Sequence, residues 1–355
     1  MEIKLRRIPF SVSVSLSVLS VLFVALPGFS VKADEVVVGV TTLAIESPER
    51  EASLNVTLWY PARDSEKTTV VGGNAVFEGT VAQKNAQIVS GNFPTVLLSH
   101  GGMRSAQHQS AWLAAKLVES GFIVADVRAP SLGYADARIA NDELWRRPID
   151  ISTAITALEN NSEWSAYIDR QRIGAVGFFL GGTSVLSLAG ASIEKESFIR
   201  SCDEIDRGMD CAWFKKFGVD LRKIDLTGLE KKHTDARIKA AVIIDPELTT
   251  SFSDQSLGSV DVPVRVINLG AQKTIISALN ASSLASKIPN SHYSMLQNAS
   301  QHSAFSVCKP KGAFILKEEG ANVEICVSDI KVGRENIHNQ MANEIIEALD
   351  RYLKK

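Results

Sequence analysis

The stretch from Arg172 to Gly190, RIGAVGFFLGGTSVLSLAG, has the spacing of a turn that displays a nucleophile. An apolar run precedes Gly177 and a second one follows Gly181, which gives the strand–turn–helix order that a nucleophile elbow requires. The apex of such a turn adopts a sparsely populated backbone conformation. The residues two positions away on either side come close together, so a Cβ at Gly177 or Gly181 would clash. The residue at the apex is Phe179.

Phe179 removes the chemistry that this kind of turn performs. In covalent acyl transfer a nucleophile attacks, a histidine takes its proton, and a carboxylate orients the histidine. A phenyl ring has no nucleophilic atom, and at the apex it would point into the space where an acyl group should lie. Thr183 and Ser184 are poor substitutes, because the first turn of the following helix carries their side chains away from the apex.

The elements that must position this turn alternate along the chain. Apolar strands separated by amphipathic helices indicate an α/β fold with a mostly parallel central sheet and helices on both faces. We expect strands at 35–45, 52–62, 93–102, 122–130, 172–178, 237–248, 262–270 and 291–298. We expect helices at 108–121, 146–161 (with Pro148 in its first turn), 181–193, 277–288 and 336–355.

Two stretches interrupt the alternation. Residues 62–93 are polar and rich in glycine, which predicts a long surface excursion. Residues 194–236 are charged and contain no strand pattern, which predicts a small lid or cap insertion over the carboxyl edge of the sheet. One domain over 34–355 that carries a lid fits the sequence better than two domains.

Residues 1–33 have the pattern of a secretory signal peptide. A basic start is followed by an apolar run, and Val-Lys-Ala precedes Asp34, which predicts cleavage after Ala33. The alternative is an uncleaved membrane anchor, because the apolar run is long for a signal. The interspersed serines and the cleavage site favour a periplasmic or secreted protein with no stable membrane span after cleavage.

The four cysteines agree with export. They allow three pairings, and we expect the two local ones, which close short loops and form a disulfide within the lid and another near the C-terminus. These pairs are Cys202–Cys211 and Cys308–Cys326.

Composition excludes several function classes. The 355 residues are 45% hydrophobic and 22% charged with a net charge of −2, which argues against a nucleic-acid binder or a polybasic membrane-surface protein. The six histidines are dispersed without metal-ligand spacing, so we expect no metal site.

An ordered set of segments resembles a known family. These segments are LWYPA, FPTVLLSHGG, GFIVADVRAPS, RRPIDISTAITAL, IDRQRIGAVGF-LGG, RIKAAVIIDPEL and NASQHSAFSVCKP. They resemble the α/β-hydrolases of the dienelactone-hydrolase and platelet-activating-factor acetylhydrolase type, especially the exported bacterial members. The segments run in family order from about residue 36 to the C-terminus. The resemblance implies an α/β-hydrolase fold, a small or lipid-like carboxylic ester as substrate, and no cofactor.

The resemblance also implies roles for individual residues. The N–H groups of Gly102 and Leu180 would form the oxyanion hole, while His100 would be structural. Asp245 would be the triad acid, and His302, in an H-x-x-F context, the base. The next strand ends in NLGAQKTI, which has no carboxylate, so elimination also favours Asp245. The alternative for Asp245 is a turn or cap residue.

Three interpretations of Phe179 stay open at this point. The chain is a hydrolase that has lost its serine, or a pseudoenzyme that binds an ester, lipid or peptide. Alternatively, the change is recent or artefactual, since one base converts a serine codon to a phenylalanine codon. A residual pair of Asp245 and His302 could activate water only feebly. We therefore expect the chain to be inactive or nearly so.

Overall fold

The computed structural model describes residues 36–102, 106–130, 132–203, 211–329 and 331–354. The predicted signal peptide, 1–33, lies outside these residues, so its cleavage stays a prediction. Within the described ranges, no helix is both long enough and apolar enough to cross a bilayer.

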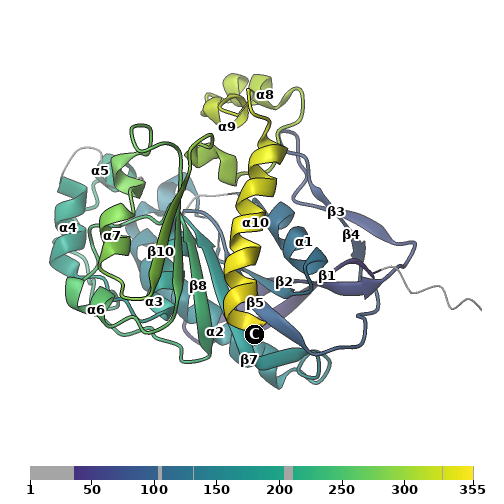
Figure 1. Ribbon diagram of the computed structural model, residues 1–355. Coiled ribbons are helices and arrows are strands. Elements are labelled where there is room, and N and C mark those ends of the chain that lie inside the picture. Colours follow the sequence, from purple (N-terminus) through teal and green to yellow (C-terminus); the bar gives the residue numbers. More distant parts are fainter. Residues whose placement is uncertain (1–35, 103–105, 131, 204–210, 330, 355) are drawn as a thin grey trace, which may run out of the picture. The chain divides into compact units, whose positions relative to one another are not determined.

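The core of the fold is a ten-stranded sheet with the strand order β10-β9-β8-β7-β5-β6-β2-β1-β4-β3 (Figure 1). The strands from β5 to β10 are mutually parallel, whereas β2 is antiparallel to both β6 and β1. The carboxyl ends of the parallel strands therefore meet at one edge of the sheet. The strands are β1 Val36–Ser47, β2 Ala52–Arg63, β3 Thr68–Val71, β4 Thr80–Lys84, β5 Phe93–Ser99, β6 Ile123–Arg128, β7 Ile168–Phe178, β8 Ile238–Ile244, β9 Val264–Leu269 and β10 Ser291–Leu296.

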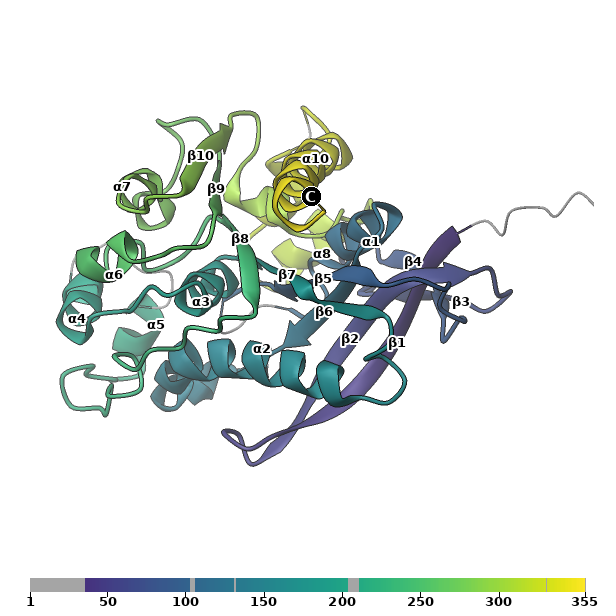
Figure 2. The ribbon, with the colours of Figure 1, turned by 60° about the horizontal axis from the view of Figure 1, so that its bottom comes forward.

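Helices cover both faces of the sheet (Figure 2). Helices α1 (Ala111–Glu119) and α10 (Arg334–Leu353) bury their apolar sides on one face, and α2 (Glu143–Asn160) and α3 (Leu180–Leu188) on the other. The shorter helices are α4 Lys195–Asp203, α5 Cys211–Lys216, α6 Asp254–Gly258, α7 Ser282–Ser286, α8 Gly312–Glu318 and α9 Glu324–Val327. Four 3₁₀ segments are η1 Tyr134–Arg138, η2 Ala140–Asp142, η3 Ser277–Leu279 and η4 Gln301–Ala304. The predicted α/β fold class is confirmed.

Two local expectations need correction. Residues 62–93 do not only run over the surface, because they contribute β3 and β4 and extend the sheet beyond β1. Helix α2 begins at Glu143, so Pro148 lies inside the helix and not in its first turn. The segment η2 leads directly into α2, which moves the start of the helix towards the N-terminus.

The predicted disulfides are both present, Cys202–Cys211 and Cys308–Cys326. The first lies in the 194–236 insertion, between α4 and α5. This insertion packs on the start of α2, where Gly228 lies so close to Trp145 that an added Cβ would come within 2.4 Å of the indole. Whether the insertion acts as a lid stays a prediction.

Candidate active site

The turn between β7 and α3 has the sharp geometry that the sequence predicts. Phe179 at its apex has φ 54° and ψ −124°, a backbone conformation that residues other than glycine rarely adopt. The Phe179 N–H donates to the Ile244 carbonyl at 3.0 Å. Its carbonyl accepts from the N–H groups of Thr183 at 3.1 Å and Glu247 at 3.3 Å. The turn is thus held by backbone hydrogen bonds from the adjacent strand β8, the loop after it and helix α3.

The two glycines of the turn are sterically required, although by different neighbours. A Cβ on Gly177 would lie 2.3 Å from the Gly181 carbonyl oxygen, as expected from the sequence. A Cβ on Gly181 would lie 2.2 Å from the Ser99 carbonyl oxygen at the end of β5. The turn is therefore pressed against the central strand as well as against itself.

The Phe179 side chain is buried in an aromatic cluster, with 3% of the residue exposed. Its ring centroid lies 5.7 Å from that of His100 and 6.0 Å from that of Phe305. Burial lowers the pKa of His100 to about 4, so this imidazole is neutral near pH 7. The cluster joins the loops that follow β5, β7 and β10, at the carboxyl edge of the parallel strands, where ligands of open α/β sheets bind.

Thr183 and Ser184 are occupied by structural hydrogen bonds. The Thr183 hydroxyl donates to the Glu247 carbonyl at 2.7 Å, and the Ser184 hydroxyl donates to the Leu180 carbonyl at 2.9 Å. Both residues are buried within α3. Each hydroxyl is therefore engaged with a backbone carbonyl.

Asp245 lies directly after β8, as predicted, and is 1% exposed with φ 42°. Its carboxylate oxygen Oδ1 accepts hydrogen bonds from the Asn268 Nδ2 at 2.7 Å and the Leu269 N–H at 2.9 Å. Burial raises the pKa of Asp245 to about 7, although these two bonds act in the opposite direction. The carboxyl group thus faces β9.

Asn268 is a residue of this site that sequence reasoning missed. Besides Asp245, its side chain bonds the Leu279 carbonyl, the Ala281 N–H and the Tyr293 hydroxyl. It is fully buried. The signal was present, because an amide in the apolar strand VRVINL needs buried partners.

His302 lies in η4, in the loop after β10, as predicted. Its Nε2 is 3.3 Å from the Gln301 Nε2 and 3.4 Å from the Asn322 Nδ2. Burial and the nearby Arg334 guanidinium lower the pKa of His302. Among the contacts of the described residues, none joins His302 to Asp245 or to Phe179. The structure therefore places the predicted acid and base in the predicted loops without linking them.

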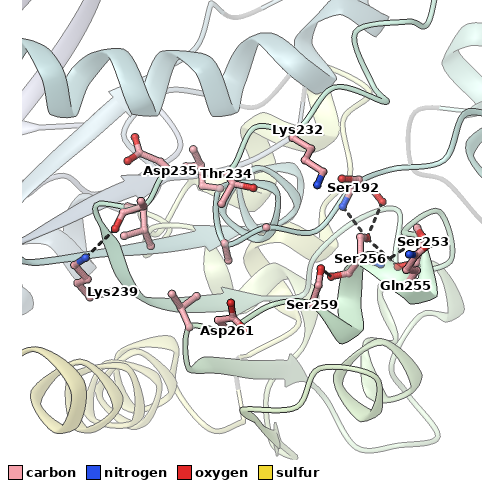
Figure 3. Close-up of a pocket in the computed structure, with 16 residues that line it drawn as sticks. Ser192, Lys232, Thr234, Asp235, Lys239, Ser253, Gln255, Ser256, Ser259 and Asp261 are labelled. Atoms are coloured by element: carbon pink, nitrogen blue, oxygen red, sulfur yellow. Dashed lines mark hydrogen bonds between the residues drawn. The ribbon is translucent and has the colours of Figure 1, made fainter.

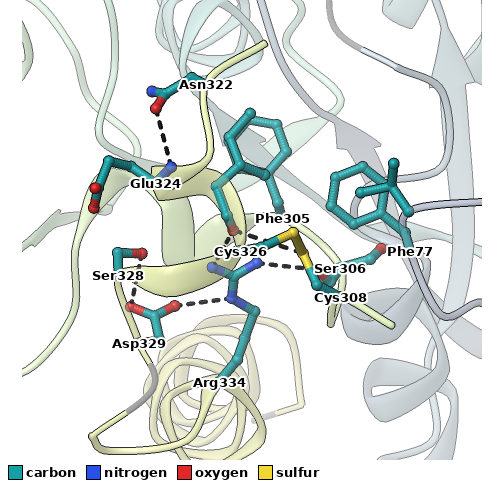
Figure 4. The surroundings of a disulfide bond; sticks show 12 residues. Phe77, Phe305, Ser306, Cys308, Asn322, Glu324, Cys326, Ser328, Asp329 and Arg334 are labelled. Carbon is teal, nitrogen blue, oxygen red and sulfur yellow. Dashed lines mark hydrogen bonds and ion pairs between the residues drawn. A yellow bond between two sulfur atoms is a disulfide. The ribbon is translucent and has the colours of Figure 1, made fainter. Parts of the chain in front are cut away.

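An ion pair and a disulfide hold the loop that contains His302 (Figure 4). Arg334 donates from Nε to Asp329 at 2.8 Å and from Nη1 to the Ser306 carbonyl at 3.1 Å. Asp329 also accepts from the Ser303 hydroxyl at 2.9 Å. The Cys308–Cys326 disulfide closes the same segment. The loop position is therefore set independently of Asp245.

The two residues predicted to form an oxyanion hole lie at the start of α3 and after β5, and their role stays a prediction. Leu180 is the first residue of α3, so its N–H has no acceptor within that helix. Gly102 follows β5, and its carbonyl accepts from the Arg147 Nη2 at 3.1 Å. Arg147, from α2, is a second residue that sequence reasoning missed.

A groove of about 760 Å³ lies elsewhere in the molecule (Figure 3). It is lined by residues near the amino ends of β8 and β9, with Ser256 bonded to Ser192 and Ser253. Ligands of open α/β sheets bind outside the carboxyl ends of the strands, so this groove is not the candidate active site. Within the described ranges, no three His, Cys, Asp or Glu side chains are grouped to hold a metal ion.

Comparisons with known proteins support the architecture. No protein-family profile and no curated protein matches the chain. Among solved structures, a ferulic acid esterase from Streptomyces cinnamoneus covers 93% of this chain and 93% of its own, with TM-score 0.58 and 16% identity. A dienelactone hydrolase from Anabaena variabilis covers 88% of this chain and 98% of its own, with TM-score 0.46 and 12% identity. The likeness to the ferulic acid esterase gives the chain an α/β-hydrolase-like fold, and at 16% identity it shows the fold alone.

Proposed function

We propose that this chain is a carboxylic-ester hydrolase scaffold whose nucleophile position is filled by Phe179, and that it hydrolyses esters not at all or very slowly. The observation that carries the proposal is the backbone of Phe179, with φ 54° between a central strand and a helix. Such a strained apex is the hallmark of the nucleophile elbow, and strain of this kind persists where the surrounding structure maintains it.

The mechanism that the scaffold would support is acyl transfer to a residue at position 179. A serine there would attack the ester carbonyl and pass its proton to His302, and collapse of the tetrahedral intermediate would break the ester C–O bond and release the alcohol, protonated by His302. Water, deprotonated by His302, would then hydrolyse the acyl-serine, releasing the acid and restoring the serine. The developing oxyanion would accept from the N–H groups of Gly102 and Leu180, a contribution of about 3 kcal/mol for one such donor. Asp245 would orient His302, which requires the acid and base to approach each other. The substrate class is a small or lipid-like carboxylic ester.

A second candidate function is an exported binding protein for an ester- or lipid-like ligand. The aromatic surroundings of Phe179 and the lack of any described contact between Asp245 and His302 favour this alternative. In that case the elbow would survive as part of a binding site. Export itself is proposed from residues 1–33 and from the two disulfides, and mass spectrometry of the secreted chain would test cleavage after Ala33.

The deciding experiment is Phe179→Ser, assayed with p-nitrophenyl acetate and butyrate and with a fluorophosphonate label. The proposal predicts hydrolysis and covalent labelling in this variant and none in the unchanged chain. Phe179→Ser/His302→Ala should lose both signals. Phe179→Ser/Ser184→Ala should keep them, because Ser184 only bonds the Leu180 carbonyl. A folded Phe179→Ser variant without activity would instead favour the binding protein.

A further inference from the structure

The start of the loop after β5 is bound by one buried guanidinium, that of Arg147 in α2. Arg147, in the second turn of α2, donates from Nη1 to the Gly101 carbonyl at 2.9 Å and from Nη2 to the Gly102 carbonyl at 3.1 Å. Arg147 is 4% exposed. Two parallel bonds from a planar fork fix orientation as well as position, which a single bond from a lysine ammonium would not do.

The first of these bonds determines where a neighbouring N–H points. In a planar trans peptide the carbonyl oxygen and the following N–H lie on opposite sides. Because the Gly101 oxygen is turned towards Arg147, the Gly102 N–H is turned away from it. Gly101 has φ 86°, a conformation that glycine adopts without strain. The orientation of the Gly102 donor is therefore linked to the position of Arg147.

A network of buried charges holds Arg147 in place. Its Nε lies 3.5 Å from the Glu143 carboxylate, which also accepts from Arg50 at 2.7 Å. Arg50, from the turn between β1 and β2, also pairs with Asp150 at 2.7 Å. Burial alone would lower the pKa of Arg50, but its bonds to the two carboxylates raise it overall. Buried ion pairs of this kind contribute more to defined geometry than to net stability.

The far end of the same loop is tied to the segment that carries His302. The Ser306 N–H donates to the Gln109 Oε1 at 3.2 Å, and the Trp112 Nε1 donates to the Ala304 carbonyl at 3.2 Å. The loop is thus anchored to α2 at its start and to the 302–306 segment at its end.

We propose that Arg147 is a positioning residue that sets the direction of the Gly102 N–H and so assembles the oxyanion hole. The proposal rests on the function proposed above, since Arg147 would orient a peptide group of the oxyanion hole proposed there. Arg147 does not touch the substrate in this scheme. It acts through its hydrogen bonds to the Gly101 and Gly102 carbonyls.

Hydrogen–deuterium exchange in the chain that retains Phe179 tests the positioning by Arg147, because it requires no enzymatic activity. Arg147→Met should speed exchange in the peptide 98–110 by at least roughly tenfold, since the restrained amides gain local openings. Arg237→Met is the matched control, because Arg237 ties the other half of α2 through Glu159 and the Ser152 carbonyl and does not contact the loop. Unchanged exchange in Arg147→Met, or an equal rise in both variants, would overturn the proposal.

Kinetics in the Phe179→Ser background test the link to catalysis. Arg147→Lys and Arg147→Met should lower kcat by roughly 10–100-fold with little change in KM, because a displaced donor acts mainly on the transition state. Added guanidinium should partly restore kcat in Arg147→Ala, whereas Arg237→Met should keep full kcat. Losses that appear in KM alone would overturn the catalytic role. If Phe179→Ser itself is inactive, the proposed function fails, and the exchange experiment still decides whether Arg147 positions the loop.

Discussion

The His100 imidazole and the Phe179 ring meet nearly at right angles, with their planes inclined by 85° and their centroids 5.7 Å apart. Aromatic pairs favour such an edge-to-face arrangement, which contributes about 0.5–1.5 kcal/mol beyond simple burial. The phenyl ring at the elbow apex is thus packed as a core side chain. Any substitution at position 179 therefore changes packing and backbone strain together.

Substitutions at Phe179 separate these two effects. Removal of a buried phenyl group costs about 3–5 kcal/mol. Phe179→Gly should nevertheless be less destabilising than Phe179→Ala by about 1 kcal/mol, because glycine relieves the strain at φ 54°. Urea unfolding at equilibrium measures both. Alanine proving the more stable of the two would show that the apex carries little strain.

Gly177 and Gly181 should tolerate no side chain. Gly177→Ala and Gly181→Ala place a Cβ within 2.3 Å and 2.2 Å of carbonyl oxygens, so each should lower the free energy of unfolding by about 3 kcal/mol or more. Gly258→Ala is the control, since no atom lies within 4 Å of the added Cβ at the end of α6. It should be neutral or slightly stabilising. Thermal unfolding measures the stability of the three variants. An equal loss of stability in all three would contradict the steric argument.

Asp245 should make the protein less stable as the pH rises. Its pKa is about 7 in the folded chain against 3.8 as the ordinary value, so between these pH values the folded state keeps a proton that the unfolded state has lost. The stability that this proton provides is present below about pH 4 and is lost as the pH rises through 7. At 1.36 kcal/mol per unit the loss is at most roughly 4 kcal/mol.

Asp245→Asn tests this prediction with little change of shape. An amide oxygen can still accept from Asn268 and Leu269, and asparagine tolerates positive φ. The variant should match the unchanged chain near pH 4 and exceed it in stability near pH 8. His100 and His338, whose pKa values burial lowers to about 4, shift stability in the opposite direction but occur in both proteins. Parallel stability curves for the two proteins would refute the prediction.

The two disulfides should have separable effects. Cys308→Ser/Cys326→Ser opens a loop closed over 18 residues and should cost about 3 kcal/mol. It should also speed amide exchange in residues 300–306, because Arg334 and Asp329 hold that loop from the same segment. Cys202→Ser/Cys211→Ser should leave residues 300–306 unchanged and loosen only the 194–236 insertion. Equal exchange of residues 300–306 in both variants would contradict a local role for Cys308–Cys326.

The fold and the elbow could be predicted from the sequence because their signals are local. An apolar strand, two glycines and an apolar helix specify the turn around Phe179, and the same periodicity specifies the parallel strands. The cysteine pairs followed from short spacing. Residues 62–93 were misjudged in part, because β3 and β4 are short strands at one end of the sheet, and TTVV and TVAQK show little alternation of apolar and polar residues.

The contacts within the site could not be predicted, because they depend on long-range packing. Arg147 meets the Gly101 and Gly102 carbonyls across 46 and 45 residues, and no local pattern distinguishes it from an ordinary helix arginine. Asn268 likewise shows its role only once β8 and β9 are adjacent. The order of Asp245 and His302 along the chain placed both in the right loops but could not show how their side chains turn.

The hydrogen bonds and close contacts that shape the bend at position 179 come from the backbone. They involve the Ile244 carbonyl, the Glu247 and Thr183 N–H groups and two glycines. The side chain at the apex can consequently be replaced while neighbouring groups keep the backbone conformation. A thiol, a selenol or an unnatural amino acid could be installed there without redesigning the backbone. For the same reason, a serine introduced by a single base change in the codon for residue 179 would stand on the same bend.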